Sequence, residues 1–204
     1  STKLDLVNVK DKQQLVFTKT YNDIKVEKIY TIDPSGYTVA LDVKVHNLTS
    51  APITQVPRIN WYQYVDPNKI DDDYGHEGPA VLVGGSIERQ EVKKLETETV
   101  LGPNVQWGSF ESKYFIASFI PEKPSVTNVV MNRDGNNMVT IGMKGGKELI
   151  PGGQNGVFSY SLYPGNAMKA SQQGDKLFSF TIDRSFVLRD ADISPEASKN
   201  LMDL

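Results

Sequence analysis

The sequence predicts an all-β protein, built as a large antiparallel two-sheet sandwich with at most one or two short helices. Apolar and polar residues alternate over many short segments, which is typical of strands that have one buried side. The chain contains 16 glycines and 11 prolines, and most of them lie between these segments, where they mark turns. Short strands at regular spacing with such punctuation favour an antiparallel sandwich.

The clearest predicted element is a hairpin over residues 24–47. Its turn is Asp33-Pro34-Ser35-Gly36, in which proline fixes φ and glycine accepts a positive φ. The residues predicted to share the buried face of its strands are apolar, apart from Lys28, which interrupts the pattern in the first strand. They are Ile24, Val26, Tyr30 and Ile32 in the first strand, and Tyr37, Val39, Leu41, Val43 and Val45 in the second.

Further strands are predicted at similar spacing along the chain. A second hairpin turn is predicted at Arg133-Asp134-Gly135-Asn136, since Asp-Gly suits the twist of paired strands. The charged segment 91–98 is predicted to be either an exposed strand or one helical turn. A short helix is predicted to begin at Ser194-Pro195-Glu196, with serine as N-cap and proline at the first helical position. The other predicted strands cover residues 15–19, 53–64, 80–83, 87–92, 114–120, 126–131, 138–143, 157–163 and 177–182.

Composition excludes several classes of function. The 204 residues suit one large domain, or one domain with an appendage. The net charge is −3 and lysines and arginines are scattered, so no basic stripe indicates nucleic-acid binding. The absence of cysteine excludes disulfides, thiol catalysis and thiolate metal sites. No run of about 20 apolar residues indicates a membrane-spanning helix.

One stretch carries a family resemblance. It runs from Trp107 through Lys113-Tyr114-Phe115 and a strand of small and apolar residues to Pro121. The early hairpin, from Phe17-Thr18-Lys19 through Lys28-Ile29-Tyr30, and the late stretch from Pro151 to Tyr163-Pro164-Gly165 agree with it. In this order, over residues 15–165, these segments resemble the periplasmic domain of the YidC membrane protein insertase.

The resemblance implies a β-supersandwich at the periplasmic face of the bacterial inner membrane. It implies a scaffold, chaperone and docking surface that assists the insertion and folding of membrane proteins. The implied partners are components of the Sec translocon and nascent membrane proteins. Membrane attachment would come from transmembrane helices that this chain lacks. The resemblance implies no enzyme activity, and the residues themselves predict no catalytic group, cofactor or metal.

The resemblance divides the chain into residues 1–165, the sandwich, and residues 166–204, an additional strand and short helix. The family continues differently after Gly165, where this chain has Asn166-Ala167-Met168, which looks like a cloning scar. The family also has strands before the position of Ser1. These departures suggest the hypothesis that residues 166–204 belong before Ser1 in the native polypeptide or derive from cloning, in which case residues 177–182 are expected to form a strand of the same sandwich.

The predicted partner-binding region lies within residues 84–106, because this stretch has mixed charge without the periodicity of a core strand. The residues proposed to contact a partner are Glu88, Arg89, Glu91, Lys93, Lys94 and Glu96. Four residues are predicted to be structural anchors, with the aromatic ones in the interior. These anchors are Trp107, Tyr114, Phe115 and Pro121.

A carbohydrate-binding or mutarotase-like sandwich is the alternative function. His46 and His76 are the two histidines, and sugar epimerases of this fold use histidine with a carboxylate as acid and base. Surface histidines are the favoured interpretation of both. Trp61, Tyr62 and Tyr64 offer aromatic platforms for sugars, although core packing is favoured for one face of this strand. The acidic loop with Asp71, Asp73 and Glu77 lacks a full calcium-loop pattern, which favours a solvated loop.

Overall fold

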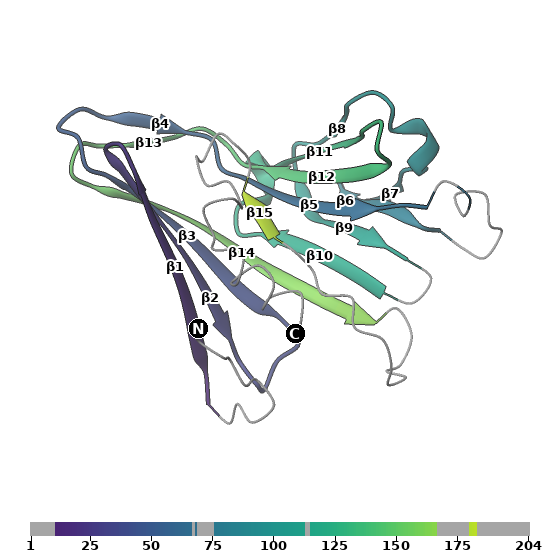
Figure 1. Ribbon diagram of the computed structural model, residues 1–204, viewed down its shortest axis with the longest axis horizontal. Helices are drawn as coiled ribbons and strands as arrows, with labels where there is room; N and C mark the ends of the chain where they lie inside the picture. Colours follow the sequence, from purple (N-terminus) through teal and green to yellow (C-terminus); the bar gives the residue numbers. More distant parts are fainter. Residues whose placement is uncertain (1–10, 67, 69–75, 113–114, 167–179, 183–204) are drawn as a thin grey trace.

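The computed structural model describes residues 11–66, 68, 76–112, 115–166 and 180–182. Two antiparallel sheets pack as a sandwich, which confirms the predicted fold class. In Figure 1 the five-stranded sheet lies above the strands β14, β10 and β9 of the larger sheet, and β1 to β3 extend away at the left. The eight-stranded sheet has the order β1 (Gln13–Tyr21), β2 (Ile24–Ile32), β3 (Val39–Asn47), β14 (Asn155–Asn166), β10 (Phe115–Pro121), β9 (Val105–Glu111), β6 (Gly78–Val83) and β7 (Ser86–Arg89).

The second sheet has five strands, and a separate two-stranded ribbon projects from the sandwich at the upper left of Figure 1. The five-stranded sheet has the order β15 (Phe180–Ile182), β5 (Arg58–Tyr64), β12 (Met138–Lys144), β11 (Asn128–Arg133) and β8 (Thr99–Leu101). The ribbon pairs β13 (Glu148–Ile150) with β4 (Ile53–Gln55). Among the described residues, the chain forms two three-residue 3₁₀ turns, η3 (Val92–Lys94) and η4 (Pro124–Val126).

The first predicted hairpin is confirmed. β2 and β3 pair from Ile24 opposite Asn47 to Ile32 opposite Val39. Asp33 closes the turn between them, because its carbonyl oxygen accepts a hydrogen bond from the Gly36 backbone N–H at 3.1 Å. Alternation holds through β3, where Leu41, Val43 and Val45 are buried. Tyr37 is an exception, since it precedes the strand and is 87% exposed.

The second hairpin is also present, but its loop differs from the predicted one. Four residues, 134–137, separate β11 from β12. The Asp134 carboxylate accepts hydrogen bonds from the backbone N–H groups of Asn136 and Met138, each at 2.9 Å. Asn137, with φ of 61°, takes the left-handed conformation that a two-residue Asp-Gly turn would require of its glycine. A short polar side chain therefore serves where glycine was expected.

The predicted strand 53–64 is wrong as a single strand, because it breaks at Val56-Pro57. β4 joins the ribbon and β5 joins the five-stranded sheet. Proline has no N–H to donate to a ladder and disfavours regular continuation of the preceding residue. The segment that pairs with these two strands is interrupted at the same position, between β12 and β13. There the Gly145 N–H donates to the Pro57 carbonyl oxygen at 2.9 Å. Both strands of this long pair are thus redirected together.

Three strands were not predicted: β8, β9 and β13. Two other predicted strands have different bounds in the structure. The strand predicted over residues 87–92 ends at Arg89 as β7, and the strand predicted over residues 126–131 begins at Asn128 as β11, because η4 comes before it. Of the two alternatives for segment 91–98, one helical turn is confirmed as η3. Residues 84–106 do contribute to the core, because Val92, Leu95 and Val105 are buried. These three residues do not recur at a regular spacing in the sequence, so they produced no alternating hydrophobic pattern. Each one lies in a turn or at the end of a strand.

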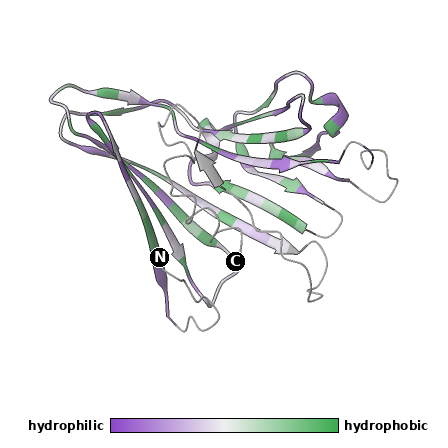
Figure 2. Cartoon of the chain, viewed as in Figure 1, coloured by the Kyte–Doolittle hydropathy of each residue, from purple (hydrophilic) through white to green (hydrophobic). Residues whose placement is uncertain are grey.

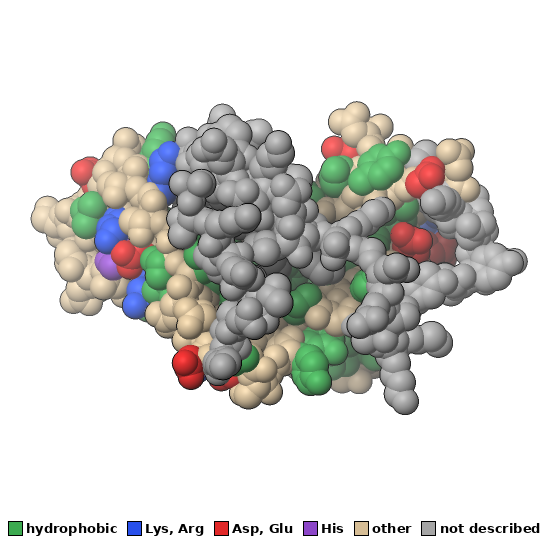
Figure 3. All heavy atoms as spheres, turned by 60° about the horizontal axis from the view of Figure 1, so that its bottom comes forward, with side chains coloured by type: hydrophobic (Ala, Val, Ile, Leu, Met, Phe, Trp, Pro, Cys, Tyr) green, Lys and Arg blue, Asp and Glu red, His purple; other side chains and the backbone are tan. Residues whose placement is uncertain are grey.

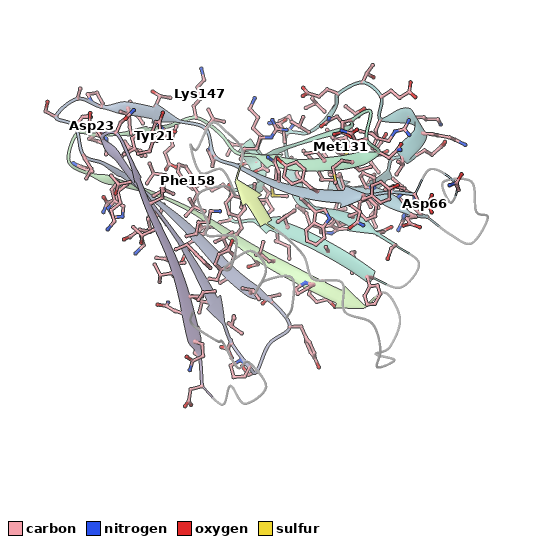
Figure 4. All side chains as sticks on the ribbon, viewed as in Figure 1. Tyr21, Asp23, Asp66, Met131, Lys147 and Phe158 are labelled. Carbon is pink, nitrogen blue, oxygen red and sulfur yellow. The ribbon has the colours of Figure 1, made fainter. Side chains whose placement is uncertain are left out.

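The core lies between the two sheets. Figure 2 shows hydrophobic and hydrophilic residues alternating along the strands, as one-sided burial requires. Phe119 of β10 is 1% exposed, and its ring meets that of Trp61 of β5 edge to face, with centroids 6.2 Å apart. Met131 of β11 is fully buried, and Phe158 of β14 is 7% exposed; both are labelled in Figure 4. Side chains from both sheets therefore build one core.

Asn47 ties together three connections at the end of β3. The residue is 1% exposed. Its amide nitrogen donates to the carbonyl oxygens of Ala51, Ile150 and Pro151 at 2.7, 3.0 and 3.2 Å. Its amide oxygen accepts from the backbone N–H and the hydroxyl of Thr49 at 3.0 and 2.7 Å. One side chain thus joins the end of the large sheet to the loops that lead into and out of the ribbon.

The late predicted strand is present in part. Phe180–Ile182 forms β15 and pairs with β5 at the edge of the five-stranded sheet. Residues 177–179 and the predicted helix at Ser194 lie outside the described residues. The native order of residues 166–204 relative to Ser1 stays a prediction.

Candidate partner-binding site

The predicted partner-binding residues lie at one edge of the sandwich. Glu88 and Arg89 belong to β7, the last strand of the eight-stranded sheet on the side away from β1. Both side chains are exposed. The Arg89 guanidinium donates to both carboxylate oxygens of Glu111 on β9, at 2.9 and 3.5 Å. This fork-shaped pair spans β6 and holds Arg89 against the outer face of the sheet.

The other four predicted residues surround η3, which leads from β7 toward β8. Val92 and Leu95 are buried and anchor this turn, and the Leu95 carbonyl oxygen accepts a hydrogen bond from the Arg133 N–H at 2.7 Å. The charged residues point outward. Lys94 donates to Glu91 at 2.6 Å, Lys93 lies 3.9 Å from Glu91, and Arg133 donates to Glu96 at 3.1 Å.

The charges of this region largely neutralise one another. The six residues comprise three carboxylates and three cations. The hydrogen bond from Lys94 lowers the pKa of Glu91 below its usual value, although Glu91 is exposed. Exposed pairs of this kind contribute little to stability. The arrangement therefore presents a polar rim without a strong field of one sign.

Beside this rim lies an apolar row that sequence analysis did not identify. Leu82 of β6 pairs with Trp107 of β9 on one side and with Ile87 of β7 on the other. The residues next to Leu82 and Trp107 face the core: Val81 is fully buried, and a Cβ on Gly108 would lie 3.0 Å from Val129 of the opposite sheet. Leu82 and Trp107 therefore point to the outer face.

Ile87, at the free end of this row, is 49% exposed, whereas Leu82 and Trp107 are half-buried. Together Trp107, Leu82 and Ile87 form the outer apolar row. An apolar centre with a polar rim is the usual anatomy of a protein-binding surface. Sequence analysis missed this row because it depends on the register between β6 and β9, and β7, η3 and β8 lie between these two strands in the sequence.

The predicted structural anchors behave differently from one another. Pro121 is buried, as an anchor should be. Trp107 lies on the outer face instead of between the sheets. Phe115 is 43% exposed, so its predicted interior position is wrong. It has the inward parity of Phe119 but is the first residue of β10, opposite the last residue of β14, where the end of the sheet is less covered. Tyr114 lies outside the described residues.

The two histidines do not form a joint site. His46 of β3 contacts the Glu27 carboxylate at 2.9 Å, and Lys25 lies 2.7 Å from the same carboxylate. Figure 3 shows histidine, acidic and basic side chains together at its left side. The ring of His76 lies 3.1 Å from the Pro79 carbonyl oxygen, just before β6. Three strands separate β3 from β6 in the sheet, which places them about 19 Å apart.

The Glu27 cluster yields a titration prediction. Hydrogen bonds from Lys25 and His46 lower the pKa of Glu27 below its usual value of 4.5. Lys25→Ala is expected to raise this pKa, because it removes the larger of the two contributions. A lowered carboxyl pKa stabilises the fold above pH of about 4.5, and this contribution is lost as pH falls through the folded-state pKa. Carboxyl-detected NMR titration measures it; Lys12→Ala is the control, and an unchanged Glu27 pKa in Lys25→Ala would contradict the assignment.

The aromatic residues of β5 divide between the two faces, as alternation predicted. Trp61 is buried in the core at 4% exposure. Tyr62 is half-buried on the outer face, where its hydroxyl accepts a hydrogen bond from Asn60 at 3.2 Å. Tyr64 is 55% exposed. Asp71 and Asp73 of the acidic loop lie outside the described residues, and the described part of the chain contains no group of three metal-binding side chains.

Comparison with known proteins places these features in a family. A profile of the YidC periplasmic domain matches residues 1–183. This chain belongs to the YidC periplasmic domain family. The resemblance in the Trp107–Pro121 stretch is thereby confirmed, and the match extends beyond residues 15–165.

Relatives of known sequence carry the name of the insertase. Membrane protein insertase YidC from Syntrophus aciditrophicus is 44% identical over 176 residues, covering 84% of this chain and 32% of the relative. The insertase YidC of Geobacter sp. strain M21 is 24% identical over 149 residues, covering 72% and 28%. The chain therefore spans about a third of the length of these relatives. In the part of the chain that the structure describes, no helix has the length and apolar character needed to span a bilayer.

Solved structures with the same fold come from proteins of different sequence. The GH36 α-galactosidase AgaB of Geobacillus stearothermophilus matches with a TM-score of 0.57 and 9% identity, over 76% of this chain and 24% of that chain. A galactose mutarotase-like protein of Lactobacillus casei matches with a TM-score of 0.54 and 8% identity, over 78% and 71%. At such identities the likeness shows the shared sandwich fold alone.

Proposed function

We propose that this chain is the extracytoplasmic domain of a membrane protein insertase at the periplasmic face of a bacterial inner membrane. In this proposal the domain acts as a scaffold and docking surface that assists insertion and folding, and it does no chemistry. Its partners are translocon components and nascent membrane proteins. The membership of the YidC periplasmic domain family supports this role.

The observation that carries the docking role is the outer apolar row at the β7 edge. Ile87 is half exposed on an edge strand, and Leu82 and Trp107 continue the apolar surface inward across the sheet. The rim has its charges in pairs, such as Arg89 with Glu111 and Lys94 with Glu91. A partner can cover this row without burying an uncompensated charge, which would be costly. We propose that five of the six charged residues form the rim and that the apolar row supplies the binding energy. Glu88 is the exception, because it pairs with the core-facing Val81 and so lies on the other side of β7.

Site-specific photo-crosslinking in the full-length insertase tests this proposal. A photoreactive amino acid replaces Ile87, and cells are irradiated while they synthesise a membrane protein. We expect adducts with the nascent protein or with translocon subunits. The matched control is Leu149 in the ribbon, which is also an exposed aliphatic residue on a short strand, at 63% exposure. Adducts at Leu149 equal to those at Ile87, or none at Ile87, would contradict the assignment.

The alternative function is carbohydrate binding, favoured by the exposed ring of Tyr64 and by the sugar-processing proteins that share the fold. The separation of His46 from His76 argues against mutarotase chemistry at a shared histidine site. Titration of the domain with galactose and glucose, observed by NMR, separates the two functions. Saturable shifts around Tyr64 would support carbohydrate binding and would count against a purely protein-docking role.

A further inference from the structure

The free edges of the two sheets differ greatly in how well they are protected. β7 has four residues, of which two are charged, and β8 has three residues followed directly by Gly102-Pro103. Short, charged or interrupted edges resist pairing with another chain. β1, at the other end of the eight-stranded sheet, has nine residues and a single charged residue, Lys19. It lacks the protection that β7 and β8 have.

β1 is also accessible along its length. Six of its nine residues are exposed, and Val16 and Tyr21 reach 52% and 50%. The other three, Leu15, Phe17 and Lys19, alternate as half-buried residues on the inward face. Figure 1 shows β1 as the outermost strand on its side, and within the described residues it pairs with β2 alone. A long and nearly uncharged edge of this kind is a template for an added strand.

We propose that a second copy of this chain binds at this edge, with β1 pairing antiparallel to β1 across a two-fold axis. We choose a second copy as the occupant because its β1 is an extended segment with the same length and the same low charge as the edge that it would pair with. With the axis at Phe17, Leu15 lies opposite Lys19 of the second copy, and Val16 lies opposite its Thr18. This register places no like charges opposite each other within the nine-residue ladder.

The inward face supports this pairing. The Phe17 ring packs edge to face on Tyr30 of β2, with centroids 5.9 Å apart, so its position is already set within one copy. In the pair, the two Phe17 side chains become cross-strand neighbours, which is a favourable combination in antiparallel sheets. The two eight-stranded sheets would continue as one sheet of sixteen strands.

Sedimentation velocity from about 1 μM to about 1 mM tests the proposal. The wild-type chain is expected to show a reversible monomer–dimer equilibrium. Val16→Lys with Thr18→Lys places lysines opposite each other and is expected to weaken dimerisation by at least about tenfold. The control, Leu149→Lys with Val157→Lys, adds the same charge at exposed positions away from β1 and should dimerise like wild type.

A second variant with the opposite charge shows whether the lysine variant loses the dimer through charge repulsion or through misfolding. Val16→Glu with Thr18→Glu should remain monomeric alone and form a heterodimer when mixed with the lysine variant. A wild-type chain that stays monomeric throughout, or dimers that both charge variants leave unchanged, would overturn the proposal.

Discussion

Phe119→Ala is expected to lower the free energy of unfolding by about 4 kcal/mol, the largest effect among the substitutions considered. Phe119 is 1% exposed and, among the residues that the structure describes, is the largest side chain buried to this degree. Its loss removes apolar contacts and the edge-to-face packing on Trp61, and it leaves a cavity between two sheets that cannot easily collapse. For a domain of this size, the melting temperature should fall by about 10 °C, measured by circular dichroism together with urea unfolding.

Phe115→Ala is the matched control for this substitution. The two phenylalanines lie in the same strand with the same parity, but Phe115 is 43% exposed. Its replacement is expected to cost about 1 kcal/mol or less, since little packing is lost. Equal losses for the two variants would show that position along β10 does not decide burial, contrary to the structure.

Asn47→Ala is expected to cost about 3 kcal/mol, because it leaves several buried polar groups without their partner. The carbonyl oxygens of Ala51, Ile150 and Pro151 lose a donor, and Thr49 loses an acceptor. Asn47→Asp should be at least as costly, since a carboxylate cannot donate and would bring negative charge against three carbonyl oxygens. Urea unfolding with a linear fit measures both effects.

Asn155→Ala is the control for Asn47, because Asn155 is an exposed asparagine near the same end of the sheet, opposite His46. A change within about 0.5 kcal/mol is expected there. If Asn47→Ala were equally mild, the connections at the end of β3 would be held by their backbone hydrogen bonds, such as Gly153 to Asn47 at 3.0 Å, and not by this side chain.

Alternation within single strands was the most reliable source of prediction. In β3 the apolar positions Leu41, Val43 and Val45 are the buried ones. In β5 alternation separated Trp61 from Tyr62 and Tyr64. The pattern is local, because successive side chains of a strand must point to opposite faces wherever the strand lies in the fold.

The candidate site was only partly predictable for the same reason. The mixed charge of residues 84–106 led to the prediction of Glu88, Arg89 and the residues around η3 as partner-binding residues. The structure places these residues at one edge of the sandwich. Composition did not show that Arg89 pairs with Glu111 across β6, nor that Trp107 and Ile87 flank Leu82. These neighbours come from three strands whose register is set by the assembled sheet.

From the residues alone came the fold class, the strand-rich pattern, the first hairpin and the family. The fold class, the strand pattern and the hairpin depend on short-range order along the chain, where turn residues and alternation act within a few positions. The family resemblance depends on the order of several segments over residues 15–165. Folding of the whole sandwich settled how much of each face is covered. Phe115 and Phe119 have the same side-chain type and parity, yet one is exposed and the other buried, because the opposing sheet covers the middle of β10 more completely than its beginning. Coverage is a property of two packed surfaces, so no single strand can encode it.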